Sequence, residues 1–312
     1  MKHPILGLHH VTATVGDAQA DLDFYRGALG LRLLKKTVNF DNHNVYHFYY
    51  GDERGTPGTI WTTFPYKGWG VPPGRHGRGQ ITVTSFSVPR GSLGFWQTRL
   101  AERGVLVQDD RTAGLKAVSA TDPSGLSLRL VEDGADGRPP WTGNGVAPEA
   151  AIRGLHSVTL TLDDPAPTVA LLSGLLGFEV VDEMERVSRL AVNGDVAGRR
   201  IELVRGSGAP AARNGLGTVH HMAMAIASSQ EQIQLRQELI ALGYQVTEVL
   251  DRQYFQSIYF REPGGVLLEV ATVRPGFAVD ETLPELGTAL KLPPWEETNR
   301  AVIMRGLPPV TP

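Results

Sequence analysis

Cysteine is absent from the sequence, and no long apolar stretch occurs in it. Without cysteine there is no disulfide, no thiolate metal ligand and no cysteine nucleophile, so histidine, aspartate or glutamate would have to hold any transition metal. No apolar run reaches the roughly 20 residues of a membrane helix, and no signal peptide is recognisable. The 33 acidic and 30 basic residues are interspersed, which disfavours nucleic acid or an anionic membrane as a partner. We therefore expect a cytoplasmic protein.

One pattern occurs four times along the chain. The 312 residues suit two ordinary domains, and each of four units is predicted to be a strand, an amphipathic helix and several further strands. The units begin at residues 7, 80, 154 and 218, and their helices are predicted at residues 18–29, 92–103, 168–176 and 229–242. We predict an α+β fold with a first domain over 1–132 (units 1 and 2), a Gly- and Pro-rich linker over 133–152, a second domain over 153–274 (units 3 and 4) and a tail over 275–312.

Two histidine pairs stand in nearly the same setting. His9-His10 and His220-His221 each open a predicted strand, and Glu269 follows in the last strand of the fourth unit. Two histidines and one carboxylate on repeated strand positions form the donor set of a 2-His-1-carboxylate metal site. Adjacent side chains point to opposite faces of an ideal strand, so we expect only one histidine of each pair to bind the metal directly.

The run GLHHVT at residues 7–12, followed by DFYRGALGL at 23–31, resembles the vicinal oxygen chelate superfamily, also called the glyoxalase/bleomycin-resistance/extradiol-dioxygenase fold. The resemblance covers almost all of residues 5–272. It implies four βαβββ modules forming two cupped-sheet domains, with metal ligands supplied by the first and last strands of two paired modules. The positions so implied are, unit by unit, His10 and Thr63, Val83 and Arg129, Ser157 and Glu202, and His221 and Glu269.

The choice of paired modules decides the metal set. Pairing the first unit with the fourth gathers His10, His221 and Glu269 and puts Thr63 at the fourth corner, which leaves positions open as a non-haem Fe(II) oxygenase requires. Pairing in sequence order would gather His221 with Glu202 and Glu269, a set closer to a Mn or Mg site. We favour a metal cup between the first and fourth units, and we expect the second and third units to be metal-free.

Further residues are similar to the hydroquinone-type ring-cleaving dioxygenases. The runs YHFYY at 46–50, GTPGT at 55–59, DR at 251–252 and YF at 254–255 carry this resemblance, whereas Gln256 replaces a residue that is often Glu. It implies that His10, His221 and Glu269 bind Fe(II), although a purified sample could hold Mn, Zn or Ni. The other active-site positions that it implies are His9, Thr12, His220, Arg252 and Tyr259.

The resemblance also implies roles for these side chains. His9 or His220 would act as general acid or base, Tyr259 would hydrogen-bond the substrate or oxygen, and Arg252 would stabilise developing negative charge. The alternatives are a packed sheet tyrosine for Tyr259 and a surface salt bridge for Arg252. Thr12 has the weakest case, because threonine is common in strands.

The sequence therefore predicts an Fe(II)-dependent dioxygenase that inserts O₂ into a small, hydroquinone-type aromatic ring and opens it to a semialdehyde or acid. We also expect a homo-oligomer. One alternative is a glyoxalase-like metal-dependent lyase or isomerase, which would usually carry a second carboxylate where Thr63 is expected. Another is a metal-free binding or resistance protein. The tail over 275–312 is predicted to be a lid over the metal cup or an arm that bridges subunits.

Overall fold

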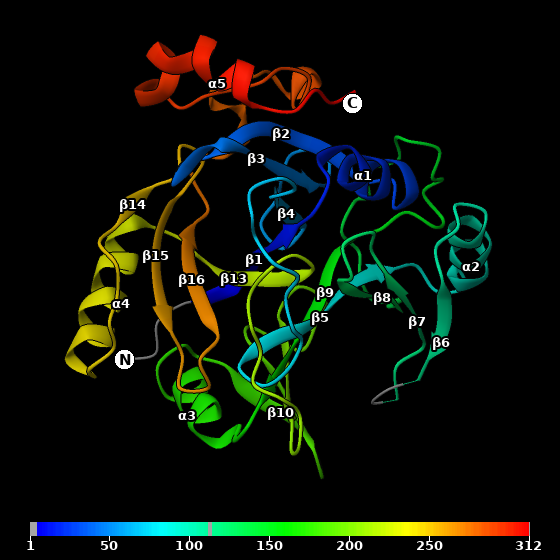
Figure 1. The fold of residues 1–312 in the computed structure, drawn as a ribbon. Coiled ribbons are helices and arrows are strands. Elements are labelled where there is room, and N and C mark those ends of the chain that lie inside the picture. Colours follow the sequence, from blue (N-terminus) through cyan, green and yellow to red (C-terminus); the bar gives the residue numbers. More distant parts are fainter. Residues whose placement is uncertain (1–4, 112–113, 312) are drawn as a thin grey trace.

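The computed structural model describes residues 5–111 and 114–311, and its strands form two eight-stranded, curled sheets (Figure 1). The order in the first sheet is β14 (Leu250–Asp251), β15 (Gln256–Arg261), β16 (Leu267–Thr272), β13 (Thr218–Ile226), β1 (Ile5–Val15), β4 (Ile60–Pro65), β3 (Asn42–Gly51) and β2 (Arg32–Asn39). The order in the second sheet is β10 (Glu179–Met184), β11 (Val187–Ala191), β12 (Arg200–Arg205), β9 (Gly154–Leu162), β5 (Gln80–Val88), β8 (Ser127–Glu132), β7 (Ala117–Thr121) and β6 (Val107–Asp110). The first sheet thus joins the first unit of the repeat to the fourth, and the second sheet joins the second unit to the third.

A helix follows the first strand of each unit, which gives the βαβββ order. These helices are α1 (Ala18–Leu22) with a π-helical turn (Asp23–Ala28), α2 (Leu93–Ala101), α3 (Ala166–Gly174) and α4 (Ser229–Ala241). Side-chain caps fix two of the starts: Asp17 accepts from the first turn of α1, and Ser228 accepts from the first turn of α4. The prediction of an α+β fold with four βαβββ modules is confirmed. None of the described helices is long and apolar enough to cross a membrane.

The two strands that carry the histidine pairs lie side by side in the centre of the first sheet. β1 pairs with β13 in antiparallel register, so that Thr12 lies opposite His221 and His10 lies opposite Ala223. β1 also pairs in parallel with β4, and β13 pairs in parallel with β16. Side chains from β4, β1, β13 and β16 therefore meet within the curl of this sheet.

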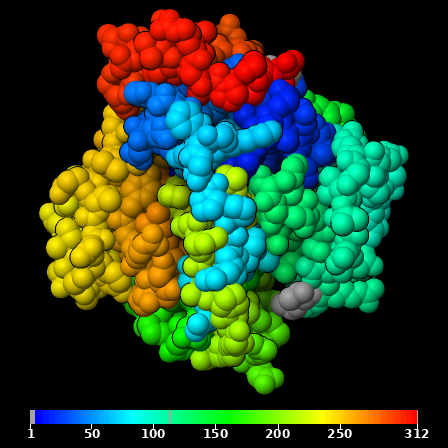
Figure 2. Space-filling model, in the orientation of Figure 1, coloured from blue at the N-terminus to red at the C-terminus, as the bar shows by residue number. Residues whose placement is uncertain are grey.

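The tail packs on the edge of the first sheet that β2 forms (Figures 1 and 2). It contains short 3-10 helices and ends in α5 (Arg300–Gly306). Leu290 forms a parallel bridge with Lys36 of β2, and buried Lys35 pairs with Asp280 and Glu281. In Figure 2 the red tail covers the blue first module.

A buried carboxyl group joins α1 to the sheet. Asp21 accepts hydrogen bonds on one oxygen from Tyr50, at 2.7 Å, and from Thr63, at 2.6 Å, while its other oxygen has no partner among the described residues. Burial raises the pKa of Asp21 from 3.8 to about 7. In the folded protein this carboxyl group therefore stays protonated over the pH range in which it ionises in the unfolded chain.

This shift predicts how Asp21 contributes to stability at different pH values. Its contribution is fully present below pH 3.8 and is lost as the pH rises through about 7. An Asp21→Asn variant lacks this titration, so its free energy of unfolding relative to wild type should rise by roughly 4 kcal/mol between pH 3.5 and pH 8, at about 1.4 kcal/mol per pKa unit. Urea unfolding over that range measures the difference, and a difference that does not change with pH would contradict the prediction. Asp17→Asn removes a carboxyl group whose pKa is lowered by a backbone hydrogen bond to Ala20, so its trend should have the opposite sign.

Candidate metal centre and active site

Three side chains from three adjacent strands meet inside the first sheet. They are His10 of β1, His221 of β13 and Glu269 of β16, and all three are buried. Nε2 of His221 lies 2.8 Å and Nε2 of His10 lies 3.3 Å from Oε2 of Glu269, and the two nitrogens lie 3.4 Å apart. The structure therefore brings together the three residues that the sequence suggested as metal ligands.

The chemistry of this triad suits a divalent metal ion. Oε1 of Glu269 accepts a hydrogen bond from Ser257, whereas Oε2 is buried, faces the two imidazoles and has no well-aligned hydrogen-bond donor in the described part of the chain. Burial opposes ionisation of Glu269, but the nearby imidazoles of His10 and His221 outweigh it and hold the pKa of Glu269 well below its usual value. Burial also lowers the pKa of His221 and so favours a neutral imidazole. A carboxylate with two imidazoles is a donor set that borderline metals such as Fe(II) accept.

The first histidine of each pair contacts the second. Nδ1 of His9 lies 2.9 Å from Nδ1 of His10, and Nδ1 of His220 lies 2.7 Å from Nδ1 of His221. A neutral ligand histidine that offers Nε2 to a metal carries its proton on Nδ1, and here that proton would be donated to the neighbouring imidazole. Burial lowers the pKa of both His9 and His220 to about 3, which keeps them neutral acceptors.

The expectation that paired histidines point to opposite faces of the sheet is wrong. Their rings meet edge to face, with centroids 5.1 Å apart for His9 and His10 and 5.0 Å apart for His220 and His221. The cause is a β-bulge at each pair: the pairing of β1 with β13 skips His9 in one strand and His220 in the other. A bulged residue leaves the regular alternation, and its side chain is re-aimed.

Thr62, and not Thr63, occupies the fourth corner. Glu269 lies beside Ala223, two residues after His221, and Thr62 lies beside Thr12, two residues after His10. Thr63 points to the other face of the sheet, where it bonds to Asp21. The position expected from the sequence, Thr63, is one residue too far along the chain. The reason is that the segment between the turn proline and this corner is one residue shorter before β4 than before β16.

A cavity of about 470 Å³ opens onto the triad. Its aromatic walls include Tyr49, Phe64 and Phe255, and the Phe255 ring packs 5.2 Å from that of His10. A ring-shaped apolar ligand with a few polar groups fits such a lining.

Three of the five further residues suggested by the sequence line this cavity: His220, Arg252 and Tyr259. Tyr259 lies opposite Glu269 on the neighbouring strand, and Arg252 donates to its hydroxyl over 3.2 Å. Burial, and then the charge of Glu269, raises the pKa of Tyr259, so its hydroxyl stays protonated. His9 and Thr12 lie behind the wall, where Thr12 accepts a hydrogen bond from Thr62. Both can therefore act only through neighbouring side chains in this conformation.

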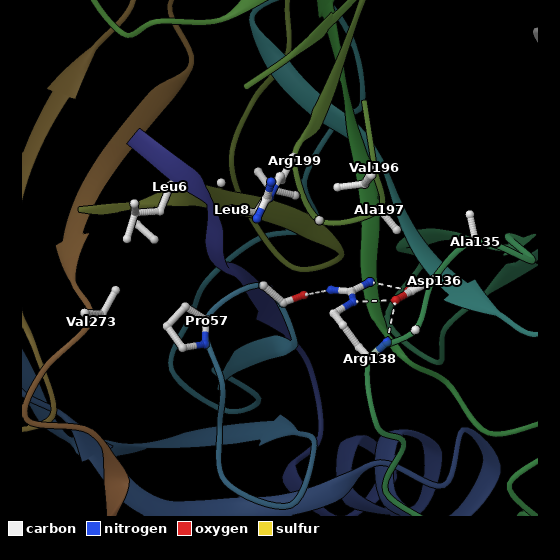
Figure 3. Close-up of a pocket in the computed structure, with 15 residues that line it drawn as sticks. Leu6, Leu8, Pro57, Ala135, Asp136, Arg138, Val196, Ala197, Arg199 and Val273 are labelled. Carbon is white, nitrogen blue, oxygen red and sulfur yellow. Dashed lines mark hydrogen bonds and ion pairs between the residues drawn. The ribbon is translucent and has the colours of Figure 1, made fainter. Parts of the chain in front are cut away.

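A second cavity, of about 510 Å³, lies elsewhere (Figure 3). It is lined by β1 and β13 of the first sheet, including Leu6, and by loops that include Pro57 and Val196. Its Arg138 is already paired with Asp136 and donates to the backbone carbonyls of residues 58 and 155. Because these polar groups are satisfied, the cavity at the triad is the better candidate for chemistry.

The family model "Glyoxalase/Bleomycin resistance protein/Dioxygenase superfamily" matches residues 7–130 and 154–270. The chain belongs to this superfamily.

The relatives within this superfamily extend over nearly the whole chain. "Putative ring-cleaving dioxygenase MhqE" of Bacillus subtilis is 44% identical over 97% of this chain and 98% of its own. The chlorohydroquinone/hydroquinone 1,2-dioxygenase of Sphingobium indicum is 36% identical over 96% of this chain and 95% of its own. The crystal structure of a "putative dioxygenase" from Bacillus subtilis, 41% identical, superposes with a TM-score of 0.94 over 99% of this chain and 98% of the other.

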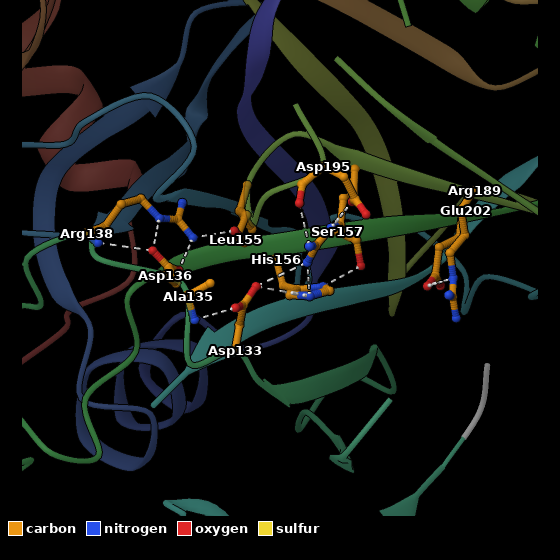
Figure 4. A network of polar contacts seen from close by, with 11 residues as sticks. Asp133, Ala135, Asp136, Arg138, Leu155, His156, Ser157, Arg189, Asp195 and Glu202 are labelled. Carbon is orange, nitrogen blue, oxygen red and sulfur yellow. Dashed lines mark hydrogen bonds and ion pairs between the residues drawn. The ribbon is translucent and has the colours of Figure 1, made fainter. Parts of the chain in front are cut away.

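In the second sheet of this glyoxalase-superfamily chain, an ion-pair cluster lies at the positions that correspond to those of the triad in the first sheet (Figure 4). Glu202 of β12 accepts from Thr159 at 2.8 Å and lies 3.5 Å from Arg129 and 3.6 Å from Arg189. The guanidinium groups thus supply the positive charge beside this carboxylate. His156 is bulged like His9, and its Nδ1 lies 3.0 Å from the Ser157 hydroxyl.

Sequence reasoning missed two residues that shape the cavity of this superfamily member. Asp41, in the turn between β2 and β3, forms an ion pair with Arg252 at 3.2 Å across the cavity mouth, and no sequence signal links two residues so far apart. His47 also lines the cavity. The alternating strand pattern of 46–50 could have placed its side chain and that of Tyr49 on one face.

Proposed function

We propose that this protein is an Fe(II)-dependent dioxygenase that opens a hydroquinone-type aromatic ring with O₂. The observation that carries the proposal is the buried His10–His221–Glu269 triad at an aromatic-walled cavity. The relative named as a chlorohydroquinone/hydroquinone 1,2-dioxygenase supports the choice of substrate. Thr62 at the fourth corner disfavours the lyase or isomerase alternative, for which a second carboxylate would be expected there.

The residues of the triad and those around it would have different roles. Bound Fe(II) would supply the redox chemistry that couples an electron-rich phenolic ring to O₂. The triad would hold the ion, while His9 and His220 orient the two imidazoles. His220 accepts through Nδ1, so its neutral form carries a proton on Nε2 that can hydrogen-bond an oxygen in the cavity.

Two further groups face the same cavity. The Tyr259 hydroxyl can donate a hydrogen bond to a ring oxygen. Burial opposes the charge of Arg252, but Tyr259 and Asp41 outweigh it and raise the pKa of Arg252, so a permanent cation stands where negative charge develops.

Oxygen uptake tests the proposal. We expect the protein, reconstituted anaerobically with Fe(II), to consume O₂ with hydroquinone, methylhydroquinone or chlorohydroquinone and to release a ring-opened semialdehyde or acid. His221→Ala should lose this activity together with its iron. Absence of uptake with these compounds and with catechol, at one Fe(II) per chain, would reject the dioxygenase and favour the lyase or isomerase. A cytoplasmic location and a homo-oligomeric state remain predictions from the sequence.

A further inference from the structure

His47 occupies a distinctive place in the cavity. It lies on β3, and its Nε2 is 2.8 Å from the Thr62 hydroxyl at the fourth corner. Its ring packs 4.0 Å from that of Tyr49 and 4.2 Å from that of Phe64. The first and fourth modules correspond here, because Ser257 bonds to Glu269 as His47 bonds to Thr62. The corner that lacks a carboxylate is therefore backed by an imidazole.

The hydrogen bonds around Thr62 fix the tautomer of His47. The Thr62 hydroxyl donates its one proton to Thr12 over 2.9 Å. It must therefore accept from His47, which places the imidazole proton on Nε2 and leaves Nδ1 as a bare acceptor. Within residues 5–111 and 114–311, the His47 side chain forms no other hydrogen bond. Burial lowers the pKa of His47 well below its usual value, which agrees with a neutral ring.

We propose that Nδ1 of His47 accepts a hydrogen bond from the substrate hydroxyl that does not bind the metal, and so selects rings with a second, donating hydroxyl. This inference rests on the proposed function and identifies a specificity-determining residue for it. His47 and the triad line one cavity. β3 is separated from β1 by β4 alone, so their backbones lie roughly 10 Å apart. An aromatic ring with oxygens at opposite ends can bridge such a span.

Ligand binding without turnover tests the proposal. Hydroquinone, phenol and 4-methoxyphenol each offer one hydroxyl to the metal, but only hydroquinone has a second hydroxyl that can donate. Their affinities are measured anaerobically by calorimetry on Fe(II)-loaded protein, with the iron content checked for each variant. Wild type should prefer hydroquinone to both other ligands by about tenfold, the size of one hydrogen bond to a buried acceptor.

The variants distinguish the roles of the two ring nitrogens of His47. In His47→Gln the side-chain amide reaches the place of Nε2 and keeps the contact with Thr62, so the preference should fall to about one. In His47→Asn an amide oxygen can take the place of Nδ1, so most of the preference should remain. Thr62→Val removes the acceptor that fixes the tautomer, so it should also reduce the preference. This variant keeps the test available should His47→Gln fail to fold. Tyr66→Phe alters another cavity-lining hydroxyl and should leave the preference unchanged.

The outcomes are distinguishable from those for the proposed function. A preference that is retained in His47→Gln at equal iron content, or that is lost in Tyr66→Phe, would overturn the assignment of His47. Equal binding of the three ligands to wild type would also overturn it. A preference that depends on His47 in a protein that takes up no O₂ would uphold the binding role and reject the dioxygenase.

Discussion

Glu269→Ala should abolish metal binding and O₂ uptake together. Glu269 is the carboxylate of the triad, and without it the two imidazoles form a neutral, two-donor site. Changes to residues outside a coordination sphere already cost about 10- to 100-fold in affinity or activity. Loss of a ligand should therefore reduce uptake by more than about 100-fold. Metal content after dialysis and O₂ uptake at saturating hydroquinone measure the two effects.

The second sheet offers a matched control for this variant. Glu202 stands at the position in β12 that Glu269 holds in β16, and it is also buried. Glu202→Gln removes a charge beside Arg129 and Arg189, so it should lower the melting temperature and yet leave metal content and uptake unchanged. Glu269→Gln keeps the shape of the side chain but should bind metal as poorly as Glu269→Ala. Full metal occupancy in Glu269→Ala, or loss of metal in Glu202→Gln, would contradict the assignment of the triad.

The sequence predicted the fold well because the repeat encodes it locally. Each unit carries its own strand and helix periodicity, and the donor chemistry of His10, His221 and Glu269 favours the pairing of the first unit with the fourth. That pairing is the one observed in the first sheet. It is a case where the composition of a site indicates which distant segments meet.

The finer geometry depended on features that no local pattern encodes. The bulges at His9 and His220 follow from the register between two strands that are far apart in sequence. The shift from Thr63 to Thr62 follows from the length of one turn. The pairing of Asp41 with Arg252 requires the completed sheet. These contacts decide which side chains face the cavity, so the contacts of His9 and His220 with the two ligand histidines could be assigned only from the structure.

The tail also differs from a simple lid. None of its described residues lines the cavity at the triad, although Trp295 packs on Phe40 at the rim with ring centroids 5.6 Å apart. One attachment of the tail is Lys35, which is fully buried and lies 2.5 Å from both Asp280 and Glu281. Whether the tail closes over the cavity or bridges subunits stays a prediction.

Lys35→Met should lower the free energy of unfolding by about 3–5 kcal/mol, because it leaves two carboxylates beside a buried site without their cation. Lys35 also lies 5.0 Å from the ring centroid of Tyr254, so the variant loses a cation–π contact as well. Urea unfolding measures the loss, and limited proteolysis should then cut the tail first. Lys67→Met is the control: Lys67 pairs with Asp17 but is 71% exposed, so its change should stay below about 1 kcal/mol.

Restoring charge balance separates electrostatics from packing. Met has nearly the length of Lys, so Lys35→Met combined with Asp280→Asn and Glu281→Gln should recover much of the lost stability, since a buried ion pair can be replaced by neutral groups at little cost. No recovery would mean that the amine is needed for its hydrogen bonds and its contact with Tyr254.

The distinction bears on activity, because Tyr254 precedes Phe255, whose ring packs 4.9 Å from His9 and 5.2 Å from His10. If the charge cluster positions this wall, Lys35→Met should raise the KM for hydroquinone while the folded protein keeps its metal.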